Sequence, residues 1–138
     1  MDYPVGAISQ SQAHTLEVVP PGQANHYGTL YGANALQMMG KAAFVCATRY
    51  ARCPVVMAKA DNIEFRRPVR LGEIIDIGAR VAFRGRSSMT VLVDMVADDA
   101  DGAEPAISGR FMMVAVDSDG APVPIPDFDQ SSTQEVLS

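Results

Sequence analysis

Apolar residues change their spacing at Pro54, and this change predicts one long helix followed by a sheet. Over residues 32–51 the apolar side chains recur every three or four positions, as on one face of an α-helix. The predicted face comprises Leu36, Met39, Ala43, Cys46, Ala47 and Tyr50. Beyond Pro54 the apolar positions recur every second residue, which is typical of strands with one face in solvent.

The alternation is clearest over residues 75–84, where Ile75, Ile77, Ala79, Val81 and Phe83 are separated mainly by polar residues or glycine. Further strands are predicted over residues 12–19, 55–65, 88–97 and 107–117. The last contains the run FMMVAV, which is apolar on both faces and indicates a strand covered on both sides. Turn residues separate the strands at 67–73, 84–86 and 98–105.

This order of elements predicts an α+β fold, an antiparallel sheet of about five strands wrapped around one long apolar helix. We expect a single domain over residues 1–138, with its core at about 12–126 and a loose tail at 127–138. One helix covers only part of such a sheet and leaves an unpaired strand edge. The sequence therefore predicts a homo-oligomer.

The composition is that of an ordinary soluble domain, because 48% of the 138 residues are hydrophobic and 20% are charged. Cys46 and Cys53 form neither a Cys-x-x-Cys nor a Cys/His pattern, so we expect reduced thiols and no metal site. The first ten residues lack a basic segment and an apolar run, so no secretory signal is predicted. Lys41 and Arg49 make the long helix a poor membrane span. We expect a cytoplasmic protein.

Charge is unevenly distributed within a net total of −5. Residues 18–60 contain no acid and four Lys or Arg, whereas ten acids and a single Arg follow residue 89. An acidic total argues against general nucleic-acid binding, but the basic subset could steer a small anionic ligand. The alternative is a chance distribution of solvated charges.

The segment PPGQANHYGTLYGA, residues 20–33, leads into the helix and contains three glycines. Amide hydrogens in the first turn of a helix have no partner within it, so they can bind whatever lies there. Amides of Gly32 and Ala33 could therefore stabilise the oxyanion that develops on an acyl carbonyl. Alternatively, Gly28 and Gly32 merely turn the chain.

Three stretches in this order, ANHYGTLYGA at 24–33, DNIEFRRPV followed by LGE within 61–73, and GRSSM at 85–89, resemble the hot-dog-fold acyl-CoA thioesterases. The resemblance is strongest to the acyl-CoA hydrolase branch and covers about residues 18–126. It implies a hot-dog fold and hydrolysis of an acyl-CoA thioester to the free acid and CoA, at a site between two subunits. Coenzyme A then arrives as part of the substrate, and no separate cofactor is expected. The expected partners are acyl-CoA and further copies of the chain, as a homodimer or an assembly of dimers.

The resemblance also implies roles for residues at the start of the helix. It makes the amide of Ala33, beside Gly32, the oxyanion donor and Asn25 the residue that helps to place the attacking water. His26 is the nearby group that could act as a base near neutral pH, although a histidine in a glycine-rich loop is often just a surface or hydrogen-bonding residue. We expect Asp61 and Glu64 to be exposed, or paired with Arg66 and Arg67, unless their face turns inward.

A second group of residues, Arg84, Gly85, Arg86, Ser87 and Ser88, matches the turn that lies near the CoA phosphates in the family. Two guanidinium groups beside a glycine and two hydroxyls suit phosphate oxygens. An ordinary exposed basic turn is the alternative.

One position departs from the family, whose general base or nucleophile is an Asp or Glu on the helix. In this chain that position is Gly40, and no carboxylate stands elsewhere on the helix. Two hypotheses follow: a thioesterase that works without this acid, and a non-catalytic acyl-CoA-binding or regulatory hot-dog protein. A hot-dog dehydratase is a third, more distant possibility, because no matching His and acid arrangement is visible.

Overall fold

Six strands and one long helix are present among residues 3–4, 11–97 and 104–126, the part of the chain that the computed structural model describes. Their order is β1 (Tyr3–Pro4), β2 (Gln12–Val18), the 3-10 turn η2 (Pro21–Gln23), α1 (Gly32–Ala51), β3 (Val55–Phe65), β4 (Ile74–Arg84), β5 (Ser88–Ala97) and β6 (Ile107–Ala115). The helix and four of the predicted strands are within one residue of their predicted bounds, and β6 ends two residues early. β1 is too short to give a sequence pattern. The predicted tail and most of the turn at 98–105 lie outside the described residues.

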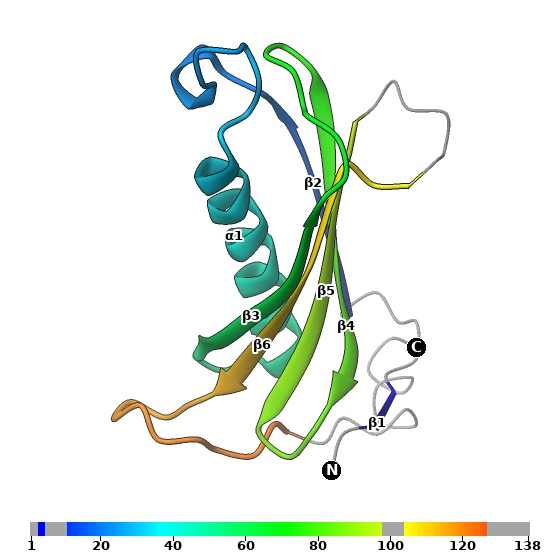
Figure 1. The fold of residues 1–138 in the computed structure, drawn as a ribbon. Helices are drawn as coiled ribbons and strands as arrows, with labels where there is room; N and C mark the ends of the chain where they lie inside the picture. Colours follow the sequence, from blue (N-terminus) through cyan, green and yellow to red (C-terminus); the bar gives the residue numbers. More distant parts are fainter. Residues whose placement is uncertain (1–2, 5–10, 98–103, 127–138) are drawn as a thin grey trace, which may run out of the picture.

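The strands form one antiparallel sheet in the order β1, β4, β5, β6, β3, and β2 pairs with β4 as well. Helix α1 lies along one face of this curved sheet (Figure 1). The predicted α+β architecture is confirmed. β6 lies between β5 and β3, as its two apolar faces indicated, whereas β3 pairs with β6 alone and forms an edge among the described strands.

The helix packs on the sheet mainly through small side chains, together with two methionines. Its buried residues are Ala35, Met38, Met39, Ala43, Cys46, Ala47 and Ala51. Leu36, predicted to be buried, is 37% exposed, because it lies on the side of α1 that faces the edge strand β3. No helix in the described part of the chain is long and apolar enough to cross a membrane.

A bulge in β4 reverses the alternation that the sequence predicted for its end. The register with β5 shifts between Val81 and Phe83, so that Phe83 is 42% exposed and Arg84 is only 8% exposed. An extra residue in one strand moves the following side chains to the opposite face. The prediction that Phe83 is buried and Arg84 is in solvent is therefore wrong.

A second bulge, in β3, brings a side chain into the core. Asn62 has a left-handed φ of 53°, and the register shifts between Asp61 and Glu64, so that Asn62 and Ile63 lie opposite Gly109. Ile63 is partly buried against the core. A Cβ at Gly109 would lie 2.5 Å from Ile63 Cδ1 and 3.2 Å from Phe111 Cε1. An alanine at position 109 would therefore force the end of the Ile63 side chain to move.

We predict that Gly109→Ala destabilises the fold by about 1–3 kcal/mol, the usual cost of overpacking a core. Denaturant unfolding measures this loss. Gly22→Ala is the matched control, because nothing lies within 4 Å of the added Cβ. Adding Ile63→Val to Gly109→Ala removes Cδ1 and should restore part of the stability. A Gly109→Ala variant as stable as the wild type would contradict this packing.

Candidate active site

The loop that leads into α1 is organised by Asn25. Its side-chain Oδ1 accepts hydrogen bonds from the backbone N–H of Tyr27 (3.0 Å) and from both the N–H (3.2 Å) and the hydroxyl (3.1 Å) of Thr29. Its backbone N–H donates to the Thr29 carbonyl at 2.8 Å, and its carbonyl accepts from Gly28, which has a left-handed φ of 79°. The Asn25 oxygen is therefore fully used within the loop, and only Nδ2 can still donate to a water molecule.

The first turn of α1 is open. Gln23 anchors it, because its carbonyl accepts hydrogen bonds from the Tyr31 N–H (3.0 Å) and from Asn34 Nδ2 (3.1 Å). Within the described residues, the amides of Gly32 and Ala33 have no hydrogen-bond acceptor, and Ala33 is exposed. The first turn carries no acid and no side-chain cap. Two free donors and the positive end of the helix dipole are thus available to an oxyanion.

His26 lies on the exposed side of this loop. Its ring centroid is 3.9 Å from that of Tyr27, and both side chains are exposed. Among the described residues, no carboxylate forms a hydrogen bond with His26, so no acid orients its imidazole. The role of His26 as a base stays a prediction.

Gly40 lies in the middle of α1, on the side that faces β3. A Cβ at this position would lie 3.2 Å from Cε of Met57. Two turns earlier on the same side, a Cβ on Gly32 would lie 3.6 Å from the ring of Phe65. Sequence reasoning missed Met57, which stood out only as one of eight methionines. The alternation of apolar residues in β3 could have placed Met57 on the face toward the helix, but this pattern could not have predicted that Met57 lies next to Gly40.

The β4–β5 turn does not present both of its arginines to solvent. Arg84 Nη2 donates to the Ile125 carbonyl at 3.3 Å, and the guanidinium carbon lies 5.9 Å from the centre of the Tyr50 ring. Arg86 is exposed, and Ser87 and Ser88 are half-buried. The structure thus gives Arg84 an internal packing role. Contact with the CoA phosphates stays a prediction for Arg86 and the two serines.

The turn and the open helix end lie far apart within one chain. Tyr50, beside Arg84, is seventeen residues beyond Ala33, which corresponds to about 25 Å of helix at 1.5 Å per residue. Figure 1 shows the β4–β5 connection and the start of α1 at opposite ends of the sheet. One chain does not bring the two groups of predicted site residues together.

The two cysteines are free thiols, as predicted. Cys46 is buried, and its thiol donates to the Ser11 carbonyl at 3.5 Å. Burial raises the pKa of Cys46 to about 11. The thiol is therefore protonated at neutral pH and unsuited to nucleophilic catalysis.

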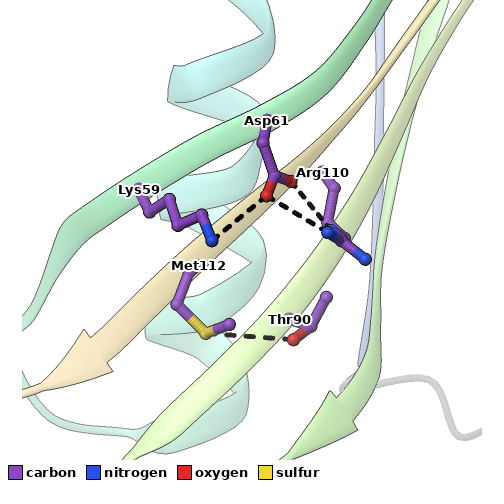
Figure 2. A network of polar contacts seen from close by, with 5 residues as sticks. All are labelled: Lys59, Asp61, Thr90, Arg110 and Met112. Atoms are coloured by element: carbon purple, nitrogen blue, oxygen red, sulfur yellow. Dashed lines mark hydrogen bonds and ion pairs between the residues drawn. The ribbon is translucent and has the colours of Figure 1, made fainter.

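The carboxylates of β3 lie on the face of the sheet away from the helix. Asp61 forms a two-point ion pair with Arg110, its cross-strand neighbour, with N–O distances of 2.8 and 3.1 Å, and Lys59 lies 3.3 Å away (Figure 2). The hydrogen bond from Arg110 lowers the pKa of Asp61. Glu64 pairs with Arg66 at 2.7 Å, as predicted. The predicted pairing of Asp61 with Arg66 or Arg67 is wrong, because the strand register places Arg110 opposite it.

A family model described as the thioesterase superfamily matches residues 27–103, more than half of the chain. The chain belongs to the thioesterase superfamily. An acyl-CoA thioester hydrolase of Zymomonas mobilis, itself uncharacterized, is 32% identical over 83% of this chain and 78% of its own length. The cytosolic acyl coenzyme A thioester hydrolase of Rattus norvegicus is 28% identical over 93% of this chain. The chain spans only 35% of the length of that relative.

Solved structures of thioesterases share the fold. An acyl-CoA hydrolase of Staphylococcus aureus, in complex with butyryl-CoA, CoA and CoA disulfide, is 28% identical, with a TM-score of 0.81 over 91% of this chain and 80% of its own. The hexameric thioesterase of Yersinia pestis is 26% identical, with a TM-score of 0.77 over 82% of this chain and 93% of its own. The hot-dog fold expected from the sequence is confirmed.

The staphylococcal enzyme was also solved as three variants, in which an asparagine, an aspartate and a threonine are each replaced by alanine. The aspartate follows the asparagine by fifteen positions, and the threonine follows the aspartate by seventeen. In the present chain, the same two intervals separate Asn25, Gly40 and Met57. At these intervals this chain has an asparagine at the first position, a glycine at the second and a methionine at the third.

We predict that Asp61→Asn lowers the melting temperature slightly at neutral pH, with a difference that disappears in acid. A carboxyl group whose folded-state pKa is lowered stabilises the fold above its ordinary pKa of 3.8, and this contribution is lost as the pH falls through the folded-state value. Thermal unfolding from pH 7 to pH 3 measures the difference. Asp119→Asn, which removes an exposed carboxylate without a hydrogen-bond donor among the described residues, is the control. A difference that grows in acid would contradict the ion pair.

Proposed function

We propose that the protein binds an acyl-CoA thioester and hydrolyses it slowly to the free acid and CoA. The observation that carries this proposal is the open first turn of α1, where the amides of Gly32 and Ala33 have no partner in the described structure. Membership of the thioesterase superfamily supports it, and so do the acyl-CoA hydrolases among its relatives. Fixed amide donors bind a developing oxyanion more strongly than the neutral carbonyl from which it forms.

In the proposed reaction, water adds to the thioester carbonyl carbon while the carbonyl oxygen accepts hydrogen bonds from Gly32 and Ala33. The carbon–sulfur bond of the tetrahedral intermediate then breaks, and the thiolate of CoA leaves and takes up a proton. Asn25 Nδ2 can donate to the water oxygen and so orient it, but an amide cannot accept the proton of the water. His26 is the candidate base.

The low rate follows from the absence of a carboxylate on α1. A positioned acid or base contributes typically about 10²- to 10⁴-fold to a proton-transfer step. Gly40 occupies the position where the resemblance implies this group, and glycine offers no proton acceptor. The amide donors polarise the carbonyl without this help, so a slow reaction remains.

A complete site requires a second copy of the chain, because the open helix end and the turn with Arg86 lie at opposite ends of one subunit. β3 offers a free edge, and large apolar side chains are exposed beside it. These are Leu36, Phe44, Val56, Met57 and Phe65. If two β3 edges pair antiparallel about a two-fold axis, the partner's helix runs in the opposite direction. The β4–β5 turn of the partner subunit then lies toward the same end as Ala33.

We further propose a homodimer, or an assembly of dimers as in the hexameric Yersinia pestis thioesterase. A cytoplasmic location is proposed from the cytosolic rat relative. CoA enters as part of the substrate, and the proposed reaction needs no other cofactor or metal. The proposed hydrolysis consumes only the thioester and water.

The second candidate function is acyl-CoA binding without turnover, in a carrier or a regulatory protein. Gly40 and Met57 favour it, because neither side chain can move a proton where the spacing sets an acid and a hydroxyl residue. Both functions use the same ligand and the same helix end. They differ only in whether CoA is released.

The deciding experiment combines a panel of acyl-CoAs of increasing chain length with a thiol-detecting reagent. We expect binding of at least one acyl-CoA and slow release of CoA that depends on the amount of protein. Binding without release would favour the carrier or regulatory function. Neither binding nor release of any acyl-CoA would overturn the proposal.

We predict that Arg86→Ala weakens CoA binding several-fold at low salt and less at high salt, because salt screens an exposed guanidinium–phosphate contact. Titration calorimetry at two ionic strengths measures the change. Arg80→Ala removes an exposed arginine from the middle of β4 and serves as the control. Equal affinities of the wild type and Arg86→Ala at low salt would make the turn an ordinary surface loop.

We also predict a mass of two chains, or of a multiple of two, in light scattering at micromolar concentration. Dilution until the assembly dissociates should abolish CoA binding, since each site would need residues from both copies. A monomer that binds CoA would remove the two-copy site from the proposal.

A further inference from the structure

The contact between Gly40 and Met57 joins two positions that are seventeen residues apart in the sequence. Met57 reaches from β3 toward α1, and its Cε lies 3.2 Å from the point where a side chain on residue 40 would begin. Few Cβ atoms have so close a neighbour. The thioether methyl group would therefore have to shift by a few tenths of an ångström to admit a side chain at position 40.

The spacing in the staphylococcal hydrolase sets these same two residues against its substituted aspartate and threonine. The asparagine that was substituted in the same enzyme has a counterpart of the same type in this chain, Asn25. Thus the position on the loop is unchanged, whereas the two positions that touch each other across α1 and β3 both differ. A change at two contacting positions is what packing requires when one side chain takes the space of the other.

We infer that Gly40 and Met57 form one steric unit, in which the methionine takes part of the space that an acid side chain at position 40 would need. This inference rests on the proposed function. It makes Met57 the residue that determines whether an acid at position 40 can work. A carboxylate introduced there alone would lie against a thioether methyl group, which offers it no hydrogen-bond donor.

Neighbouring side chains support an apolar character for this part of the site. Leu36 and Phe44, one turn before and one turn after Gly40 on α1, are 37% and 48% exposed. Met57 is 44% exposed and thus accessible to a bound acyl group or to a second copy. A methionine chain is flexible and fits varied apolar partners, so this wall suits the retention of an acyl chain.

Stability tests the steric unit without any ligand. Gly40→Ala, Met57→Thr and the double variant form a cycle with the wild type, read by thermal unfolding. We expect Gly40→Ala to gain more stability when Met57→Thr is also present, because threonine removes Cε while alanine favours the helix. Strict additivity of the changes in melting temperature would overturn the steric unit, whatever the protein binds.

Measurements of CoA release test the functional consequence of the steric unit. We expect the double variant of Gly40→Asp and Met57→Thr to raise CoA release at least about tenfold, part of the usual effect of a positioned base, and by more than the product of the two single changes. Gly40→Asn with Met57→Thr is the matched control, because it keeps the shape and lacks the proton acceptor. If Gly40→Asp alone released CoA as fast as the double variant, the role of Met57 would be overturned. The same conclusion would follow if the double variant folded and bound the ligand but released CoA no faster than the wild type.

Binding separates this inference from the proposed function. A non-hydrolysable thioether analogue of an acyl-CoA serves as the probe for the wild type and each variant. Binding to all variants with additive effects on turnover would overturn the coupling and leave the proposed function standing. Absence of binding to every variant would overturn the proposed function, and the stability cycle would still decide whether the two residues act as a unit.

Discussion

The packing of α1 on the sheet is the interaction on which the rest of the structure depends. The buried side of the helix consists of four alanines, a cysteine and two methionines. Within the sheet, the bulge at Asn62 turns Ile63 inward, and Ile63 lies over Gly109. Apolar burial over this contact is the main stabilising term for the fold.

This packing also determines what remains uncovered. A single helix cannot shield a six-stranded sheet, so β3 is left as an edge among the described strands, with exposed apolar side chains on its helix-facing side. At the start of α1, the Gln23 carbonyl ties the loop to Tyr31 and Asn34, and the amides of Gly32 and Ala33 have no acceptor among the described residues. The open end of α1 and the β3 edge therefore lie on the same side of the molecule, as the proposed site between two copies requires.

The polar groups of the molecule divide between the two faces of the sheet. The ion pairs of Asp61 and Glu64 lie on the face away from the helix and stay remote from the candidate site. On the side of α1 toward β3, apolar groups meet at Gly40 and Met57. The proposed chemistry thus relies on backbone donors and on His26 as the candidate base, without a carboxylate on α1, and this agrees with a slow reaction.

The sequence by itself determined the elements, because the spacing of apolar residues depends only on the local geometry of helices and strands. It also determined the helix start with Gly32 and Ala33, the lack of an acid at Gly40, and the family. Tertiary structure alone decided the contacts that depend on register. Single-residue bulges placed Arg84 inside and Phe83 outside, the register paired Asp61 with Arg110, and packing brought Met57 to Gly40. A one-residue shift between strands leaves almost no local signal, yet it reverses every side chain that follows.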